Sequence, residues 1–151
     1  MPMEVVLQVE VEAPVERVWE AVATQEGLRG WFNPAISFEP RLGGWVEFAG
    51  EHGGSPYRFG GAVVEFAPPR RVTWEWNWVP ARWPDPTLLT LELEPLAASG
   101  GTRVTLRHHG WERLPAEIRD QTFAGFQRGW ASDDELADLK RYLASAVAVL
   151  A

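Results

Sequence analysis

Among the polar residues of this 151-residue chain, His108 is the one best placed to take part in ligand binding or acid–base chemistry. Side chains on an extended strand alternate between two faces, so Val104, Leu106 and His108 share the apolar face and His109 lies on the other. An inward imidazole can hydrogen-bond a ligand carbonyl or serve as a general acid or base. More often such a histidine is structural, held by the closing helix or by a backbone carbonyl, and both interpretations stay open. His109 is expected to be solvated.

Three tryptophans on one predicted strand form the largest apolar surface in the sequence. Trp74, Trp76 and Trp78 alternate with polar residues across positions 71–78, so the three indoles share a face. An aromatic side chain buries on the order of 150–250 Å², and this face therefore needs a wide cover. Such a row either fills a core or lines a cavity for an aromatic, sterol-like or acyl ligand.

Further side chains are candidates for the wall or rim of a cavity. Phe126 and Trp130 fall on a predicted closing helix, where they can be core residues and cavity walls at once. Arg58 and Arg82 can bind a ligand carboxylate through the guanidinium fork, although surface arginines are more commonly solvated. Glu75 is expected to face solvent, opposite the tryptophans. The candidate ligand-binding residues are Trp74, Trp76, Trp78, Arg82, His108, Phe126 and Trp130.

Composition excludes several classes of site and partner. The chain has no cysteine, which removes disulfides, thiolate nucleophiles and cysteine-based metal sites, and adjacent histidines on one strand cannot chelate one metal. Nucleophile elbows and phosphate-binding or dinucleotide-binding glycine loops are absent from the sequence, so we expect no metal and no cofactor. The net charge of -7 disfavours nucleic acid. With no apolar run of the ~20 residues that span a bilayer and no signal pattern, we expect a cytoplasmic protein without membrane insertion.

The periodicity of the chain predicts the strands that carry these residues. Alternating apolar and polar side chains indicate strands at 4–12, 36–39, 45–48, 58–66, 71–78, 89–94 and 102–108. Residues 51–56 are predicted to be a flexible loop, and the proline-rich residues 79–86 an irregular one.

Helices are predicted near both ends. Pro14, at the first helical position, opens a helix that ends near residue 23, and Thr24 caps a second short helix. A closing helix starts at Pro115, and the capping pair Ser132 and Glu135 starts or restarts it. This order predicts an α+β fold in which a curved antiparallel sheet of six to seven strands wraps round a long C-terminal helix, with residues 1–151 forming one domain.

The chain resembles the START-related helix-grip superfamily (SRPBCC), because Val9 to Trp31 is similar to its A-P-x-E/D-x-V-W opening. Other motifs are similar in order and spacing to the branch of heat-shock chaperone ATPase activators and their bacterial relatives: Leu42-Gly43-Gly44, Pro68-Pro69-Arg70-Arg71-Val72, Val104-Thr105-Leu106-Arg107-His108 and Gly129-Trp130 with Leu139 and Leu143. The loop with Arg82 and Trp83 matches no motif of that branch. Ser132-Asp133-Asp134 inserts residues into the closing helix, which leaves open whether the helix is continuous, kinked or broken there.

The resemblance implies a cavity for hydrophobic ligands, and three functions remain open. The first is a binding module for a small hydrophobic or aromatic molecule, without catalysis. The second is a cyclase-like or hydratase-like enzyme on a polycyclic or acyl substrate, with His108 as acid or base and Arg82 as anion anchor. The third is an interaction domain that resembles the chaperone activators and contacts a chaperone or another protein. We expect a monomer or a homodimer.

Overall fold

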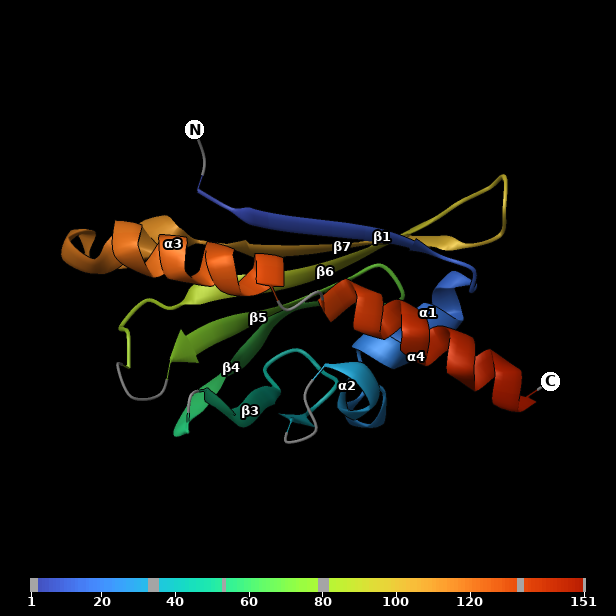
Figure 1. The fold of residues 1–151 in the computed structure, drawn as a ribbon, viewed down its shortest axis with the longest axis horizontal. Helices are drawn as coiled ribbons and strands as arrows, with labels where there is room; N and C mark the ends of the chain where they lie inside the picture. Colours follow the sequence, from blue (N-terminus) through green and yellow to red (C-terminus); the bar gives the residue numbers. More distant parts are fainter. Residues whose placement is uncertain (1–2, 33–35, 53, 79–81, 133–134, 151) are drawn as a thin grey trace.

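The computed structural model of the chain describes residues 3–32, 36–52, 54–78, 82–132 and 135–150. Seven antiparallel strands form one sheet in the order β1-β7-β6-β5-β4-β3-β2, and the helices lie on its concave side (Figure 1). The elements are β1 (Val5–Val11), α1 (Val15–Val22), α2 (Gln25–Trp31), β2 (Ser37–Phe38), β3 (Trp45–His52), β4 (Ser55–Ala67), β5 (Arg71–Trp78), β6 (Thr87–Pro95), β7 (Thr102–His109), the 3-10 helix η1 (Trp111–Arg113), α3 (Ala116–Ser132) and α4 (Glu135–Leu150).

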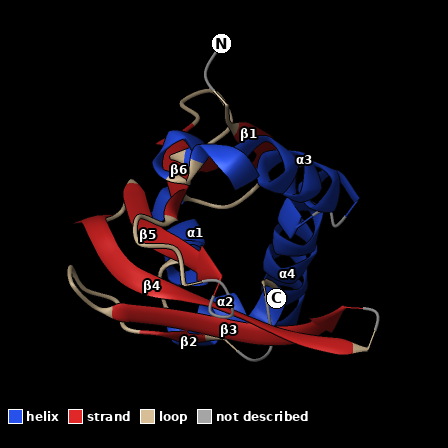
Figure 2. Cartoon of the chain, turned by 90° about the vertical axis from the view of Figure 1, so that its left-hand side faces the viewer, coloured by secondary structure: helices blue, strands red, loops and turns tan. Residues whose placement is uncertain are grey.

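The sheet is a continuous meander closed by the first strand. Strands β2 to β7 pair with their neighbours in chain order, and β1 then pairs with β7, with Val5 opposite His108 and Val11 opposite Thr102. Viewed from its end, the sheet curls round the helices (Figure 2). The predicted α+β arrangement of a curved antiparallel sheet with two short helices after the first strand is confirmed.

The prediction of a flexible loop at residues 51–56 is wrong. Residues 51–56 were expected to form a flexible loop, but β3 continues to His52 and β4 begins at Ser55, with Glu51 opposite Pro56. Gly54 has a φ of +82°, in the left-handed region that glycine adopts without steric cost. Gly54 therefore favours a tight hairpin between β3 and β4.

The two helices after β1 form as the capping signals indicate. Pro14 was predicted at the first helical position of α1, but it is the N-cap residue, so the helix begins one residue later at Val15. Thr24 caps α2, because its hydroxyl accepts a hydrogen bond from the Gly27 amide at 3.0 Å and donates one to the Glu20 carbonyl at 2.6 Å. Phe32, the C-cap residue of α2, is thereby placed beside the concave face of the sheet.

The C-terminal helical segment contains two helices, α3 and α4. Helix α3 runs through Ser132 and α4 begins at Glu135, while Asp133 and Asp134 lie outside the described residues. The two helices point in different directions (Figures 1 and 2). Helix α4 packs on β1 and against α1 and α2, whereas α3 follows η1, which the periodicity did not predict. In the part of the chain that the structure describes, no helix is long and apolar enough to cross a membrane.

The two faces of the sheet differ in character. The concave face and the helices bury the apolar core, whereas partly exposed ion pairs cross the outer face. Arg107 contacts Glu4 at 2.5 Å and Glu92 at 2.9 Å, and Arg103 bridges Glu10 and Glu94. Exposed pairs of this kind contribute little stability individually, so the concave core carries most of the folding free energy.

Replacing Thr24 by alanine removes the hydroxyl that links α1 to α2. We expect Thr24→Ala to lower the free energy of unfolding by about 1 kcal/mol in urea denaturation. Thr24→Ser keeps the hydroxyl and serves as the matched control, with most of the stability retained. An equal loss in both variants would show that the methyl group, not the cap, matters.

Candidate functional site

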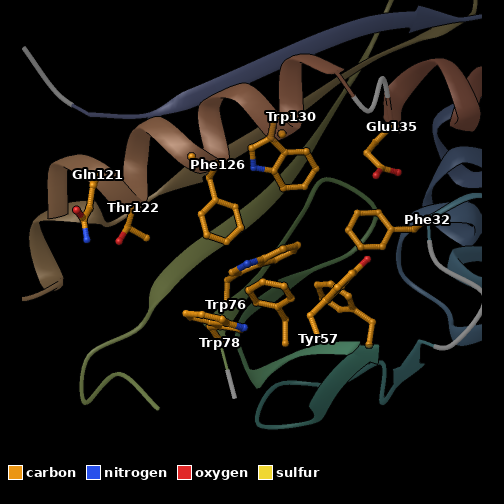
Figure 3. Close-up of a pocket in the computed structure, with 13 residues that line it drawn as sticks. Phe32, Tyr57, Trp76, Trp78, Gln121, Thr122, Phe126, Trp130 and Glu135 are labelled. Atoms are coloured by element: carbon orange, nitrogen blue, oxygen red, sulfur yellow. The ribbon is translucent and has the colours of Figure 1, made fainter. Parts of the chain in front are cut away.

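A cavity of about 650 Å³ lies between α3 and strands β3, β4 and β5. Eight of its lining side chains are aromatic: Phe32, Phe48, Tyr57, Phe59, Trp76, Trp78, Phe126 and Trp130. The remaining described lining residues are Gln121, Thr122, Gly125, Gly129 and Glu135, and Figure 3 shows how the walls face one another.

Cross-strand pairing builds the aromatic wall on the sheet. Phe48 on β3 is directly opposite Phe59 on β4, and their rings stack with centroids 5.5 Å apart. Trp76 on β5 completes the cluster, at 4.6 Å from Phe48 and 5.0 Å from Phe59. Offset and tilted aromatic pairs at these separations are favourable beyond the area they bury, so the wall is well packed.

Helix α3 presents two different rows of residues to the cavity. Side chains four positions apart lie on the same side of a helix, so Thr122, Phe126 and Trp130 form one row beside the row of Gln121, Gly125 and Gly129. A Cβ atom built on either glycine would find no neighbouring atom within 4 Å. The glycine row therefore leaves open space where larger side chains would fill the cavity.

His108 is completely buried, and both of its ring nitrogens are engaged. The indole N–H of Trp130, which can only donate, lies 2.9 Å from Nδ1, so Nδ1 accepts. Nε2 therefore carries the proton and donates to the hydroxyl of Thr87 at 2.8 Å, and that hydroxyl donates to the Trp76 carbonyl at 3.1 Å. This chain of hydrogen bonds links α3 to β7, β6 and β5.

Burial keeps His108 neutral. It lowers the pKa of the imidazole well below its usual range, and the adjacent His109 adds to the effect. The ring also lies 4.4 Å from that of Trp111, whose indole N–H donates to the His108 carbonyl at 2.9 Å. These contacts are those of the structural histidine that the sequence left as one alternative.

His109 is only partly solvated, in contrast to the expectation that it faces water. It does lie on the opposite face from His108, but it is half-buried and its Nε2 is 2.8 Å from the Thr90 hydroxyl. Burial is the main cause of its lowered pKa, partly offset by Glu4 and Glu112. The Thr90 hydroxyl that contacts His109 is also 2.8 Å from the hydroxyl of Thr73, so His109 joins a polar cluster on the outer face.

The structure brings four of the seven predicted site residues together at the cavity. They are Trp76, Trp78, Phe126 and Trp130, with Trp78 the most open of them at 41% exposure. Trp74 is buried deeper, with its ring beside Phe32 and Phe38, and His108 lies behind Trp76 and Trp130.

Arg82 is next to a cavity wall through its backbone, because its amide donates to the Trp78 carbonyl at 2.9 Å. It is exposed, has a φ of 49° and is not among the described lining residues. The ligand-binding roles of all seven residues stay predictions.

Two buried indole N–H groups have no hydrogen-bond partner within the described residues. They belong to Trp74 and Trp76, and an unpartnered buried donor carries a free-energy cost. Because Trp76 lines the cavity, a bound molecule with an acceptor atom is one means of relieving that cost there.

Several lining residues escaped the sequence analysis. The alternation that revealed the tryptophans also places Phe48 and Phe59 inward, so parity could have found them. Tyr57 lies across Gly50, where a Cβ atom would be 2.6 Å from the tyrosine oxygen, and no sequence signal marks this close approach. Glu135 was interpreted only as a capping residue, yet it lines the cavity.

Lowering the pH tests the buried neutral imidazole. The pKa of His108 is about 6.5 in the unfolded chain and well below that in the folded one, so the unfolded chain takes up the proton first as the pH falls. We expect the free energy of unfolding to fall below pH 6.5, with up to about 1.4 kcal/mol per pH unit coming from His108.

The control for this pH effect is substitution at each histidine. In urea denaturation at pH 7 and pH 5, His108→Gln should lose most of this slope and His109→Gln should retain the larger part. NMR of the imidazole nitrogens should show the Nε2–H tautomer at pH 7. The same slope in His108→Gln as in the parent would contradict the assignment.

Solved structures with similar folds support the architecture. A protein from Mesorhizobium loti superimposes with a TM-score of 0.72 at 20% identity, over 94% of this chain and 97% of that chain. DynU16, a putative protein in the dynemicin biosynthetic locus, has a TM-score of 0.73 at 23% identity. The match covers 97% of this chain and 49% of DynU16. The Aha1 dimer from Colwellia psychrerythraea has a TM-score of 0.63 at 22% identity, over 91% and 92% of the two chains.

At these identities the likeness establishes the fold alone. No curated protein sequence matches the chain significantly. The family model described as Activator of Hsp90 ATPase homolog 1-like protein, however, matches residues 12–144, which include every described residue that lines the cavity. The predicted resemblance to the helix-grip branch of chaperone ATPase activators is confirmed. The chain belongs to the Activator of Hsp90 ATPase homolog 1-like family, an SRPBCC-type helix-grip family.

Proposed function

We propose that this protein is a binding module that holds a small hydrophobic or aromatic molecule between the sheet and α3. The observation that carries the proposal is the aromatic cavity of about 650 Å³. Ligand pockets in proteins typically measure roughly 300–1,000 Å³ and combine apolar walls with a few polar groups. Here the polar groups include Tyr57, Gln121, Thr122 and Glu135.

The glycines of α3 support the same proposal. Glycine within a helix costs about 1 kcal/mol relative to alanine, yet Gly125 and Gly129 both line the cavity in the middle and last turns of α3. Alanine at either position would meet no atom within 4 Å. Alanine at these positions would stabilise the helix, and the glycines instead leave the cavity open along this row.

The enzyme alternative has less support from the geometry. It assigned acid-base chemistry to His108, whose two ring nitrogens are bonded to Trp130 and Thr87 behind the cavity wall. It also assigned anion binding to Arg82, which is exposed in the loop before β6. Among the described lining residues the titratable side chains are Tyr57 and Glu135, and a lone carboxyl group beside a phenol is a weak basis for catalysis.

A second candidate function comes from the family. Its description names an activator of the Hsp90 ATPase, so an interaction with a chaperone of this type is a specific alternative that needs no ligand. DynU16, from a biosynthetic locus, instead fits a role with small molecules. The two functions make different predictions for the cavity.

Filling the cavity from α3 tests the binding module. We expect Gly125→Leu to weaken binding of the neutral fluorescent probe N-phenyl-1-naphthylamine at least about tenfold, because the leucine side chain projects into the ligand space. Gly125→Ala is the matched control: it should retain most of the binding and raise the free energy of unfolding by about 0.5–1 kcal/mol. Native mass spectrometry before and after organic extraction should show an adduct in the parent only before extraction. Equal probe affinity in the parent and Gly125→Leu would contradict the proposal.

The chaperone alternative is tested with the same variants. If the protein activates a chaperone through its outer surface, the ATP turnover of the host's Hsp90-type chaperone should rise when the purified chain is added. Gly125→Leu should give the same rise, because the cavity is not used. Unchanged turnover over a full titration would exclude direct activation.

A further inference from the structure

The indole N–H of Trp76 is an unused hydrogen-bond donor at the cavity. An indole N–H can only donate, and three other buried tryptophans donate to acceptors of the chain: Trp31, Trp111 and Trp130. The N–H groups of Trp74 and Trp76 have no partner in the part of the chain that the structure describes. Of these two, Trp76 alone is among the described residues that line the cavity.

The side chains round Trp76 cannot supply the missing acceptor. Its closest ring contacts are with Phe48, Phe59, His108 and Trp130, at centroid distances of 4.6–5.5 Å. Phenylalanine has no acceptor atom, the indole of Trp130 can only donate, and both ring nitrogens of His108 are engaged. The Trp76 nitrogen is also shielded from water in this structure. A bound molecule is the remaining source of an acceptor.

The cavity gives a ligand room to approach this donor. In Figure 3 the Trp76 ring lies between α3 and the strands, with its nitrogen directed toward the Trp78 side of the cavity and away from Phe32. Trp78 is the most exposed aromatic wall, and a Cβ atom on Gly125 or Gly129 would meet no atom within 4 Å. A small movement of a neighbouring side chain therefore suffices to uncover the nitrogen.

The lining favours an acceptor without charge. Lysine, arginine and histidine are absent from its described residues, so a buried carboxylate would lose its hydration without gaining a cationic partner. A carbonyl oxygen costs far less to desolvate than a carboxylate, and one N–H donor satisfies much of that cost. The aromatic wall on the sheet and the glycines on α3 suit a flat ring system between them.

We propose that the ligand is an uncharged, flat aromatic or polycyclic molecule with a carbonyl oxygen, and that this oxygen accepts a hydrogen bond from the Trp76 indole. The ring body lies between the aromatic wall and the row of Gly125 and Gly129. This assignment rests on the proposed binding function and specifies its ligand class. A hydrocarbon of the same shape leaves the donor unpaired, so the site discriminates between the two.

Three naphthalenes with different substituents test the assignment. They are 2-acetylnaphthalene, 2-isopropenylnaphthalene and 2-naphthoate, each titrated into the whole protein by NMR. The first two have the same shape, because a methylene group replaces the ketone oxygen, and the hydrophobic effect alone would favour the alkene. We expect the ketone to bind about fivefold or more tighter than the alkene, and the carboxylate to bind weakest.

Two variants locate the donor. Trp76→Phe keeps an aromatic ring but removes the N–H, so the preference for the ketone over the alkene should disappear. Trp74→Phe is the matched control, because it removes the other unpartnered buried N–H, which is outside the described lining. It should retain the ketone preference. Gly125→Leu should weaken every probe that binds the parent, which places the binding in this cavity.

The indole proton of Trp76 reports the contact directly in the parent protein. Its signal, assigned by triple-resonance NMR, should move downfield with the ketone relative to the alkene, while that of Trp74 should not distinguish the two. This measurement keeps the test valid if Trp76→Phe does not fold.

The outcomes distinguish the two proposals. The carbonyl assignment is overturned, and the binding module stands, if Gly125→Leu weakens binding but the alkene or the carboxylate binds as tightly as the ketone. The same holds if the ketone preference persists in Trp76→Phe or the Trp76 indole signal does not distinguish ketone from alkene. If no probe binds, or Gly125→Leu changes nothing, both proposals fall.

Discussion

The hydrogen-bonded imidazole of His108 is the interaction on which the cavity depends. It accepts from Trp130 on α3 and donates to Thr87 on β6, and Thr87 continues to the Trp76 carbonyl on β5. Each group in this chain is buried, so breaking one bond leaves a polar group unsatisfied in a low-dielectric interior. The chain thereby holds two cavity walls, Trp76 and Trp130, in a defined relation, at 5.5 Å between ring centroids.

The cavity survives because α3 packs on the sheet with only one of its two inner rows. Phe126 contacts Phe59 and Trp76, and Trp130 contacts His108, so this row supplies the packing. Gly125 and Gly129 in the other row have no side chains, and the space that side chains would fill stays open. Packing and open space are thus divided between adjacent rows of one helix, which explains how a packed core and an open pocket coexist beside the same sheet.

Much of the architecture and part of the site could be predicted because they depend on local periodicity. Alternation along one strand is sufficient to place Trp74 and Trp76 inward and Glu75 outward, and Glu75 does lie away from the indoles, accepting a hydrogen bond from the Ala62 amide. The inserted residues before Glu135 left open whether the closing helix is continuous, and the structure describes it as α3 and α4. The ends of the strands were harder to predict from the sequence, because a glycine such as Gly54 is compatible with both a flexible loop and a tight hairpin.

By itself, the sequence determined which side chains point inward and to which superfamily the chain is similar, since both follow from residue order. Only the tertiary structure decided what each inward side chain does. Trp74 and Trp76 have the same parity, yet Phe38 covers the first and the cavity opens beside the second. His108 became structural because Trp130, 22 positions away, reaches its Nδ1. Covering and pairing of this kind depend on contacts between distant segments, which no local period encodes.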